Sequence, residues 1–350
     1  MLPLTEELAR KFGREAGTLV TVRMRRPEAL PVVIRTWQDE PEILRAVGRA
    51  LPQVPQCLAT GPDFALHTYV EGVPLSSVCA DGKPLDTLLV KALAEVFAQM
   101  APVRRSELPR LPASWPRDDE DSQGFLRTLA FEADRQIRRP NQEAFGSLFA
   151  ALGIPENALA RLADRAPTMR RRPFGLLHTD LHRDNLILPS DEEAPLFCVD
   201  WELATFGDPL HDLATHLVRM GYPEQQRPEV VESWAEAVGR SRPGALDGLD
   251  QDLDLYLDFE EAQSVYPDVM RAAALLRDRA DEEGLAAATA RVRAALEAAA
   301  RPLSLAAVPS EQEVERILSR WRDARVESAP PALIALDLPS VMRDPAPALR

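Results

Sequence analysis

The stretch "GLLHTDLHRDNLIL", residues 175–188, places ionisable side chains inside an otherwise apolar segment. His178, Asp180 and His182 occupy alternate positions in it, and the apolar residues on both sides predict short buried strands. Two chemistries would use such a cluster. One is a metal site built from the histidines, and the other is a phosphoryl-transfer site built from Asp180 and Asn185.

The continuation of this stretch favours phosphoryl transfer. Such a site needs a carboxylate that orients and deprotonates the acceptor, oxygen ligands for Mg²⁺, and a cation for the phosphates. Asp180 and Asn185 supply the base and one ligand from one loop, and Asp200 follows in "CVDWE". Two short strands around a polar turn at 189–195 would form a hairpin that brings Asp200 to the same end as Asn185.

Composition excludes several classes of protein. The chain has 350 residues with 45% hydrophobic content, which is enough for a large core and more than one lobe. A net charge of −14 argues against a nucleic-acid partner, whose phosphates require a basic face. The three cysteines are far apart, so neither a disulfide framework nor a zinc knuckle is predicted.

The chain also lacks the sequence marks of a membrane or secreted protein. No uninterrupted apolar run approaches the ~18 residues of a membrane span. The N-terminus, "MLPLTEELARKFGREAG", is charged and has no apolar centre of the kind found in signal peptides. We therefore expect no membrane partner and a cytoplasmic location.

Residues 1–72 predict a small mixed lobe. The runs "LVTVRM" (19–24) and "PVVIRTW" (31–37) have the length and β-branched content of strands. "DEPEILRAVGRAL" (39–51) predicts a helix with Asp39 as its N-cap. "FALHTYVEGVPL" (64–75) returns to strand character, and Gly72 is the expected point at which the chain changes lobe.

The remainder of the chain predicts a mostly helical lobe. Residues 84–100 and 271–300 each carry an apolar stripe at helical spacing. We expect residues 73–300 to form this second lobe, which contains the catalytic loop and the metal site. Residues 301–350 would add one helix, "EQEVERILSRWRDA" (311–324), and a tail rich in proline and alanine.

Taken together, "HTDLHRDNLIL…FCVDWELATFGDPLHDLA" resembles the signature of the aminoglycoside phosphotransferase and choline kinase-like family, distant relatives of protein kinases. "VVIRT", "DEPEILRAV" and "FALHTYVEGVPL" occur in the order typical of the family. The resemblance covers residues 15–300. It implies an α+β, two-lobed protein kinase-like fold with a small β-rich N-terminal lobe.

The resemblance also implies roles for particular residues. Asp180 would be the catalytic base, and Asn185 and Asp200 would bind Mg²⁺. Arg35 stands where the family usually has the strand lysine that touches the nucleotide phosphates, and Glu40 would be its helix partner. An arginine there keeps the charge but bonds differently.

Other positions complete the site that the resemblance implies. The backbone from Thr68 to Val70 would form the hinge that binds the nucleotide base. Glu202 follows the metal aspartate in place of the glycine of a kinase and is a possible outer ligand of the metal. His178 and Asp212 would brace the catalytic loop, and Asp208 is predicted to be a helix N-cap.

The acidic stretch at 246–271 bears on the acceptor. In the family, helices at this location line the acceptor pocket. Asp258, Glu260 and Glu261 would there suit an amine-bearing antibiotic. The alternative is a solvated acidic face of a helix.

The function predicted from these observations is transfer of the γ-phosphate of ATP or GTP to a hydroxyl of a small molecule. The leading acceptor is an antibiotic, with resistance by phosphorylation as the result. The alternative acceptor is a metabolic amino alcohol, sugar or nucleoside-like compound. The enzyme would be a monomer or a homodimer.

Two alternatives belong to other classes of protein. The first is a metallohydrolase whose ligands are His178, Asp180 and His182, with His211 or His216 as a further ligand. The second is a non-catalytic binding module with a kinase fold.

Overall fold

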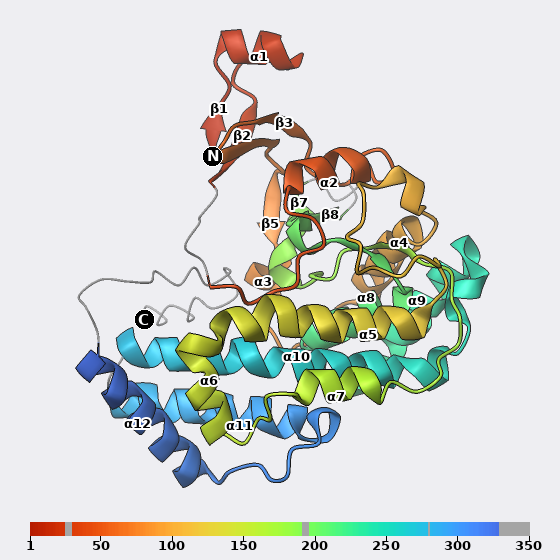
Figure 1. The fold of residues 1–350 in the computed structure, drawn as a ribbon. Coiled ribbons are helices and arrows are strands. Elements are labelled where there is room, and N and C mark those ends of the chain that lie inside the picture. The colour runs from red at the N-terminus through yellow and green to blue at the C-terminus, as the bar shows by residue number, and fades with distance from the viewer. Residues whose placement is uncertain (25–29, 191–195, 279–280, 329–350) are drawn as a thin grey trace.

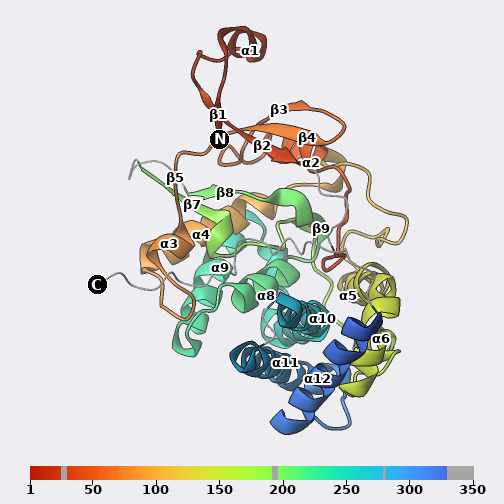
Figure 2. The same ribbon diagram turned by 90° about the vertical axis from the view of Figure 1, so that its left-hand side faces the viewer.

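The computed structural model describes residues 1–24, 30–190, 196–278 and 281–328, which form a small β-rich lobe and a larger helical lobe (Figures 1 and 2). This is the α+β, two-lobed architecture that the sequence predicts. The conformation of the tail and of the turn at 191–195 falls outside the described residues. In the described part of the chain, no helix is both long and apolar enough to cross a membrane.

The sheet of the small lobe is antiparallel, in the order β1 (Leu2–Pro3), β2 (Leu19–Met24), β4 (Phe64–Thr68), β3 (Cys57–Thr60). Successive side chains of a strand point to opposite faces. On β2, Val20 therefore packs with Leu4 and with Ala9 of α1 (Glu6–Phe12) in a small core. Arg23 has the opposite parity and lies on the other face, towards the helical lobe.

Helix α2 (Glu40–Val47) confirms the helix predicted after Asp39. Pro41 lies in its first turn, and Ile43, Leu44 and Val47 are buried at helical spacing. The hydrophobic stripe of α2 therefore packs into the main core of the protein.

The strand predicted for residues 31–37 is wrong. These residues are irregular, and we call them the strap. Their polar groups bind side chains of the helical lobe: Asn141 Nδ2 donates to Pro31 O at 2.8 Å, and Thr36 Oγ1 binds Thr205 Oγ1 at 2.6 Å. These tertiary contacts override the strand propensity of the β-branched residues. In Figure 1 the strap is the red segment that passes above α5 towards α2.

Two small sheets lie between the lobes. β5 (Gly72–Pro74) begins at the residue where a change of lobe is predicted, and it pairs with β7 (Leu186–Pro189). β7 pairs in turn with β8 (Phe197–Cys198), which confirms the predicted hairpin. The second sheet joins β6 (Gly175–Leu177) to β9 (Thr205–Gly207). The catalytic loop, residues 178–185, therefore runs from β6 to β7.

The helical lobe is built around α10 (Leu249–Asp278) and α11 (Glu282–Leu303), which Figure 2 shows end-on. The predicted helix near residue 311 is confirmed as α12 (Glu311–Ser328). The other helices are α3 (Leu75–Val78), α4 (Thr87–Met100), α5 (Ser122–Ala133), α6 (Gln142–Ala151), α7 (Ala158–Asp164), α8 (Pro209–Arg219) and α9 (Arg227–Ser241). Short helical turns are η1 (Arg105–Glu107), η2 (Asp134–Arg138), η3 (Arg139–Asn141), η4 (Arg183–Asn185), η5 (Trp201–Leu203), η6 (Glu224–Gln226) and η7 (Pro243–Leu246).

A buried charge network ties the start of α8 to α10. Arg172 is 0% exposed and binds both oxygens of Asp208 at 2.7–3.0 Å and Asp252 at 2.6 Å. Tyr256 donates to Asp208 at 2.9 Å. Asp208 also accepts from Leu210 N at 3.0 Å, which confirms it as the N-cap of α8.

Breaking this network should destabilise the fold strongly. In Arg172→Met, two carboxylates stay buried without their cation, and we expect a loss of about 3–5 kcal/mol of unfolding free energy. Urea denaturation measures it. Arg171→Met is the matched control: Arg171 is exposed and pairs with Asp118 at the surface, so its removal should change the unfolding free energy far less than that of Arg172. Equal losses in the two variants would contradict this account.

Helix α8 also holds the catalytic loop from below. Asp212 accepts hydrogen bonds from His178 N at 3.0 Å and Thr179 N at 2.7 Å, as expected of a brace. His216 Nδ1 lies 2.8 Å from Leu181 O, and its Nε2 lies 3.0 Å from the hydroxyl of Tyr222. A carbonyl oxygen can only accept, so Nδ1 carries the proton and Nε2 accepts from Tyr222. Burial lowers the pKa of His216 to about 4, which keeps the ring neutral.

The buried ring of His216 predicts a loss of stability in mild acid. Below pH ~6.5 the unfolded chain binds a proton at this histidine, whereas the folded chain binds it only near its lowered pKa of about 4. Stability therefore falls as the pH falls through this window, by about 2 kcal/mol between pH 7 and pH 5 from His216 alone.

His216→Gln isolates this contribution, because glutamine can keep both hydrogen bonds without titrating. Urea denaturation at pH 7 and pH 5 should show a smaller acid loss in this variant than in the wild type. His178 and His211 also have a lowered pKa through burial and still contribute in both proteins. An identical pH dependence in variant and wild type would refute the assignment.

Candidate active site

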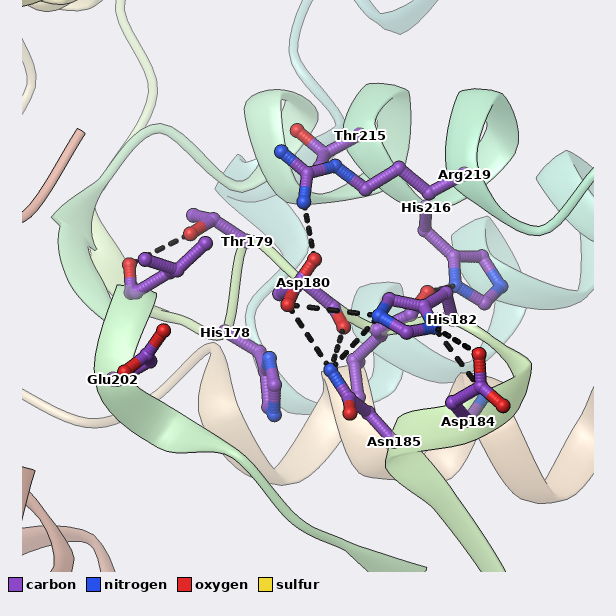
Figure 3. A network of polar contacts seen from close by, with 12 residues as sticks. His178, Thr179, Asp180, His182, Asp184, Asn185, Glu202, Thr215, His216 and Arg219 are labelled. Atoms are coloured by element: carbon purple, nitrogen blue, oxygen red, sulfur yellow. Dashed lines mark hydrogen bonds and ion pairs between the residues drawn. The ribbon is translucent and has the colours of Figure 1, made fainter. Parts of the chain in front are cut away.

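The carboxylate of Asp180 lies at the centre of a polar cluster, and both of its oxygens are bound (Figure 3). Asn185 Nδ2 donates to Asp180 Oδ2 at 3.1 Å and to the Asp180 carbonyl at 2.9 Å. Arg219, at the end of α8, donates to Asp180 Oδ1. His182 Nε2 lies 3.6 Å from Asp180 Oδ2. The loop and α8 therefore fix the direction of this carboxylate.

Asp180 is also held in its ionised form. Burial alone would raise its pKa, but Arg219 and then His182 outweigh burial and lower the pKa to about 2. At neutral pH the side chain is therefore a hydrogen-bond acceptor. That is the state required of a group that accepts a proton from a hydroxyl.

The two residues predicted to bind metal lie at the same end of the β7–β8 hairpin. Val199 N donates to Asn185 O at 2.9 Å, which keeps the residues before Asp200 beside the loop. The Nδ2 of Asn185 is turned to Asp180, so its Oδ1 points the other way. An amide oxygen and a carboxylate are ligands that Mg²⁺ prefers, and the donor set fits that ion.

Arg23 is a site residue that the sequence reasoning missed. Its guanidinium binds Glu40 at 2.8 and 2.9 Å and Asp200 at 3.0 and 3.1 Å. It therefore connects strand β2, helix α2 and the predicted metal aspartate. The regular alternation of "LVTVRM", with a single cation on the face opposite Val20, is the signal that could have identified it.

The cluster around Arg23 contains more negative than positive charge. Burial favours its neutral form, but Asp200 and Glu40 raise its pKa, so the guanidinium stays charged. Burial raises the pKa of Glu40 although Arg23 opposes it. One cation thus faces two carboxylates. The remaining negative charge favours a divalent cation at Asp200.

The predicted pairing of Arg35 with Glu40 is wrong. Arg35 lies on the strap and binds Glu202 at 2.9 Å, while Glu40 binds Arg23. The physical reason is the irregular path of residues 31–37, which places Arg35 against η5 of the helical lobe. Glu202, predicted as an outer ligand of the metal, is thus engaged by a cation.

The predicted hinge residues Thr68 and Val70 line a cleft of about 680 Å³. The other lining residues are Arg14, Tyr69, Glu71, members of the segment 52–56 such as Val54, and members of the β7–β8 hairpin such as Phe197. Thr68 N donates to Gln56 O at 2.9 Å, so the N–H of Thr68 already has a hydrogen-bond partner within the chain. Recognition of the base by the hinge stays a prediction.

The three carboxylates predicted to bind the acceptor lie on two faces of α10. Glu260 is buried and lines a cavity of about 30 Å³ that Arg219 also lines. Asp258 binds Arg301 of α11 instead. Burial, then Asp258, raises the pKa of Glu261, and Arg301 opposes both. Of the three, only Glu260 is placed beside the catalytic loop.

The histidines of the loop have separate partners. His178 donates from Nε2 to Val199 O at 3.1 Å and packs on the ring of Trp201 at 4.4 Å, which is a bracing role. His182 Nδ1 accepts from Asp184 N at 3.3 Å at the start of η4. Within the described ranges, no group of three histidine, cysteine or acidic side chains could hold a metal ion. The arrangement therefore does not support the metallohydrolase alternative.

Comparison with known proteins places this geometry in a family. The chain matches the sequence model of the phosphotransferase enzyme family over residues 9–250, which is more than half of its length. No curated protein matches the chain in sequence.

Several solved structures resemble the protein at low sequence identity. An ethanolamine kinase of Plasmodium vivax is 11% identical, with 79% of this chain and 75% of that chain covered and a TM-score of 0.51. A choline kinase of Streptococcus pneumoniae is 14% identical, with 81% and 86% covered and a TM-score of 0.48. A macrolide 2'-phosphotransferase of Brachybacterium faecium is 18% identical, with 79% and 85% covered and a TM-score of 0.45.

The family match covers the loop and hairpin that carry Asp180, Asn185 and Asp200. The chain therefore belongs to the phosphotransferase enzyme family, and it is an enzyme that phosphorylates a hydroxyl group of a small molecule.

Proposed function

We propose that the enzyme transfers the γ-phosphate of ATP or GTP to its acceptor with Asp180 as the base. The observation that carries this proposal is the link from Arg23 to both Glu40 and Asp200. It places a fixed cation of the small lobe next to the predicted metal ligand. Phosphoryl transfer requires a phosphate-binding cation and a metal site in such proximity.

The roles of the other residues follow from their positions. Asn185 and Asp200 would hold Mg²⁺, which would neutralise charge on the transferred phosphate. Asp180, held ionised between Arg219 and Asn185, would orient the acceptor hydroxyl and take its proton. Arg23, and not Arg35, would contact the phosphates.

The leading acceptor remains the hydroxyl of an antibiotic, and the alternative remains a metabolic amino alcohol, sugar or nucleoside-like compound. The cytoplasmic location and the monomeric or dimeric state also stay predictions.

Loss of the base should abolish transfer. In Asp180→Asn the group that accepts the proton is gone, and we expect turnover to fall by about 10²–10⁴-fold. Release of ADP or GDP is measured against a panel of hydroxylated antibiotics and metabolites, and mass spectrometry identifies the phosphorylated product. Asp184→Asn is the control on the same loop, since Asp184 binds Ser76 at 2.5 Å. Wild-type turnover in Asp180→Asn would reject the role of Asp180.

A pair of arginine variants tests the phosphate anchor. Arg23→Ala removes the cation between Glu40 and Asp200, and we expect kcat/KM for the nucleotide to fall by about 10²-fold or more. Arg35→Ala removes only the contact with Glu202, so its effect should be much smaller. Steady-state kinetics at saturating acceptor measure both. The opposite order of effects would return the anchor role to Arg35.

A further inference from the structure

A second group of residues faces the catalytic loop from the strap. The cavity of about 30 Å³ is bounded by Arg219, which binds Asp180, and by residues of both lobes. Val33, Ile34 and Thr36 of the strap form one side of it. The opposite side comes from the helical lobe: Trp115, Leu129, Thr179, Leu203, Thr205, His211, Phe259, Glu260 and Gln263.

The strap is fixed to the helical lobe along its length. Besides the bonds of Pro31 and Thr36, the amide of Gln136 in η2 binds the backbone of Arg35 twice, at 3.0 Å to N and 3.3 Å to O. Trp37 Nε1 donates to Arg110 O at 3.2 Å. Because an irregular segment must satisfy its backbone groups with such contacts, they define its position. These contacts therefore fix the strap in place as one wall of the cavity.

The walls carry both apolar and polar side chains, and the polar groups are largely bound to one another. Thr36 binds Thr205, and Thr179 Oγ1 donates to Leu203 O at 2.7 Å. Val33 and Ile34 complete the apolar surface formed by Trp115, Leu129, Leu203 and Phe259. A ligand that enters here meets mostly hydrocarbon.

Glu260 does not offer a free carboxylate to an amine. It is 1% exposed, and Gln263 Nε2 donates to its Oε2 at 3.1 Å. Arg219 faces it from α8 and opposes the rise in pKa that burial causes. A polycation would have to displace Arg219 and desolvate its own charges, which is costly in a buried site.

One buried polar atom of the wall is available to a ligand. His211 is 4% exposed, and its Nδ1 lies 3.5 Å from Glu260 Oε1 without forming a hydrogen bond within the described residues. Buried polar atoms of this kind are normally satisfied. A hydroxyl or ether oxygen of a ligand would satisfy this one.

On the basis of the proposed function, we propose that the strap is the specificity wall of the acceptor site, and that Val33 and Ile34 select a hydroxyl carried on a largely apolar skeleton. A cavity of about 30 Å³ holds about one water molecule, so it receives the hydroxyl-bearing end of the acceptor and not the whole skeleton. The amine-bearing acceptor predicted from the acidic stretch is thereby disfavoured.

Binding measurements test this selection independently of turnover. Isothermal calorimetry with Mg-ADP present compares macrolides and other alcohols on apolar skeletons with aminoglycosides, choline and ethanolamine. We expect the tightest ligand to come from the first group. Val33→Ala and Ile34→Ala should each change its Kd by about 10-fold or more, since each removes methyl groups from the wall.

Val32→Ala is the matched control, because Val32 is the neighbouring β-branched residue of the strap and is not part of the cavity wall. It should leave the Kd of the acceptor unchanged. All three variants should stay folded and keep the wild-type nucleotide Kd. A tightest ligand that is an aminoglycoside or an amino alcohol, no binding by any apolar alcohol, or equal effects of the three variants would each overturn the proposal.

The proposed function is judged separately. Phosphate transfer to the bound acceptor is measured with ATP and with GTP in the same proteins. Binding with the expected specificity but without transfer rejects Asp180 as the base and leaves the strap as the specificity wall. Transfer whose acceptor preference is the same in Val33→Ala, Ile34→Ala and wild type rejects the strap as the specificity wall and leaves the proposed phosphotransferase function in place.

Discussion

The interaction between Arg23, Glu40 and Asp200 is the constraint on which the active site depends. The side chain of Arg23 on strand β2 binds Glu40 of helix α2 and Asp200 after the β7–β8 hairpin, so it connects these three elements. A guanidinium can bind two carboxylates at once because its donors form a planar fork. Arg23 and Asp200 are half-buried, and this partial burial strengthens the contacts by lowering the local dielectric. The two lobes are thereby held in a register that places Asp200, the predicted metal ligand, beside Arg23, the proposed phosphate anchor.

The charge of Asp180 also results from two opposing effects. The carboxylate is buried and would by itself favour protonation, and Arg219 at the end of α8 reverses this preference. The same helix supports the loop through Asp212 and His216. One helix therefore sets both the backbone position and the charge of the predicted base. An acceptor hydroxyl that reaches Asp180 would bind an oxygen that already accepts from Arg219 or from Asn185.

The parts of the candidate site whose arrangement the sequence predicts correctly are local. Asp180 and Asn185 lie on one loop, and a short hairpin brings Asp200 to the same end, so spacing and strand propensity are sufficient. Arg23 and Arg35 differ in this respect. Both follow β-branched runs, but only residues 19–24 have strand partners, whereas residues 31–37 bind Gln136, Asn141 and Thr205. Those partners are more than a hundred residues away in the chain, and single-sequence patterns do not reveal them.

The acidic stretch shows why counts of charge do not predict a binding site. At helical spacing, Asp258 and Glu261 share one face and Glu260 lies on another. Each face then meets a different cation, Arg301 on α11 or Arg219 on α8. Once these partners are in place, the buried carboxylate beside the loop is bound within the protein by Gln263. In the proposed acceptor site, the chemistry offered to a substrate therefore depends on which charges the fold has already paired, together with the two aliphatic side chains that the strap adds to the cavity wall.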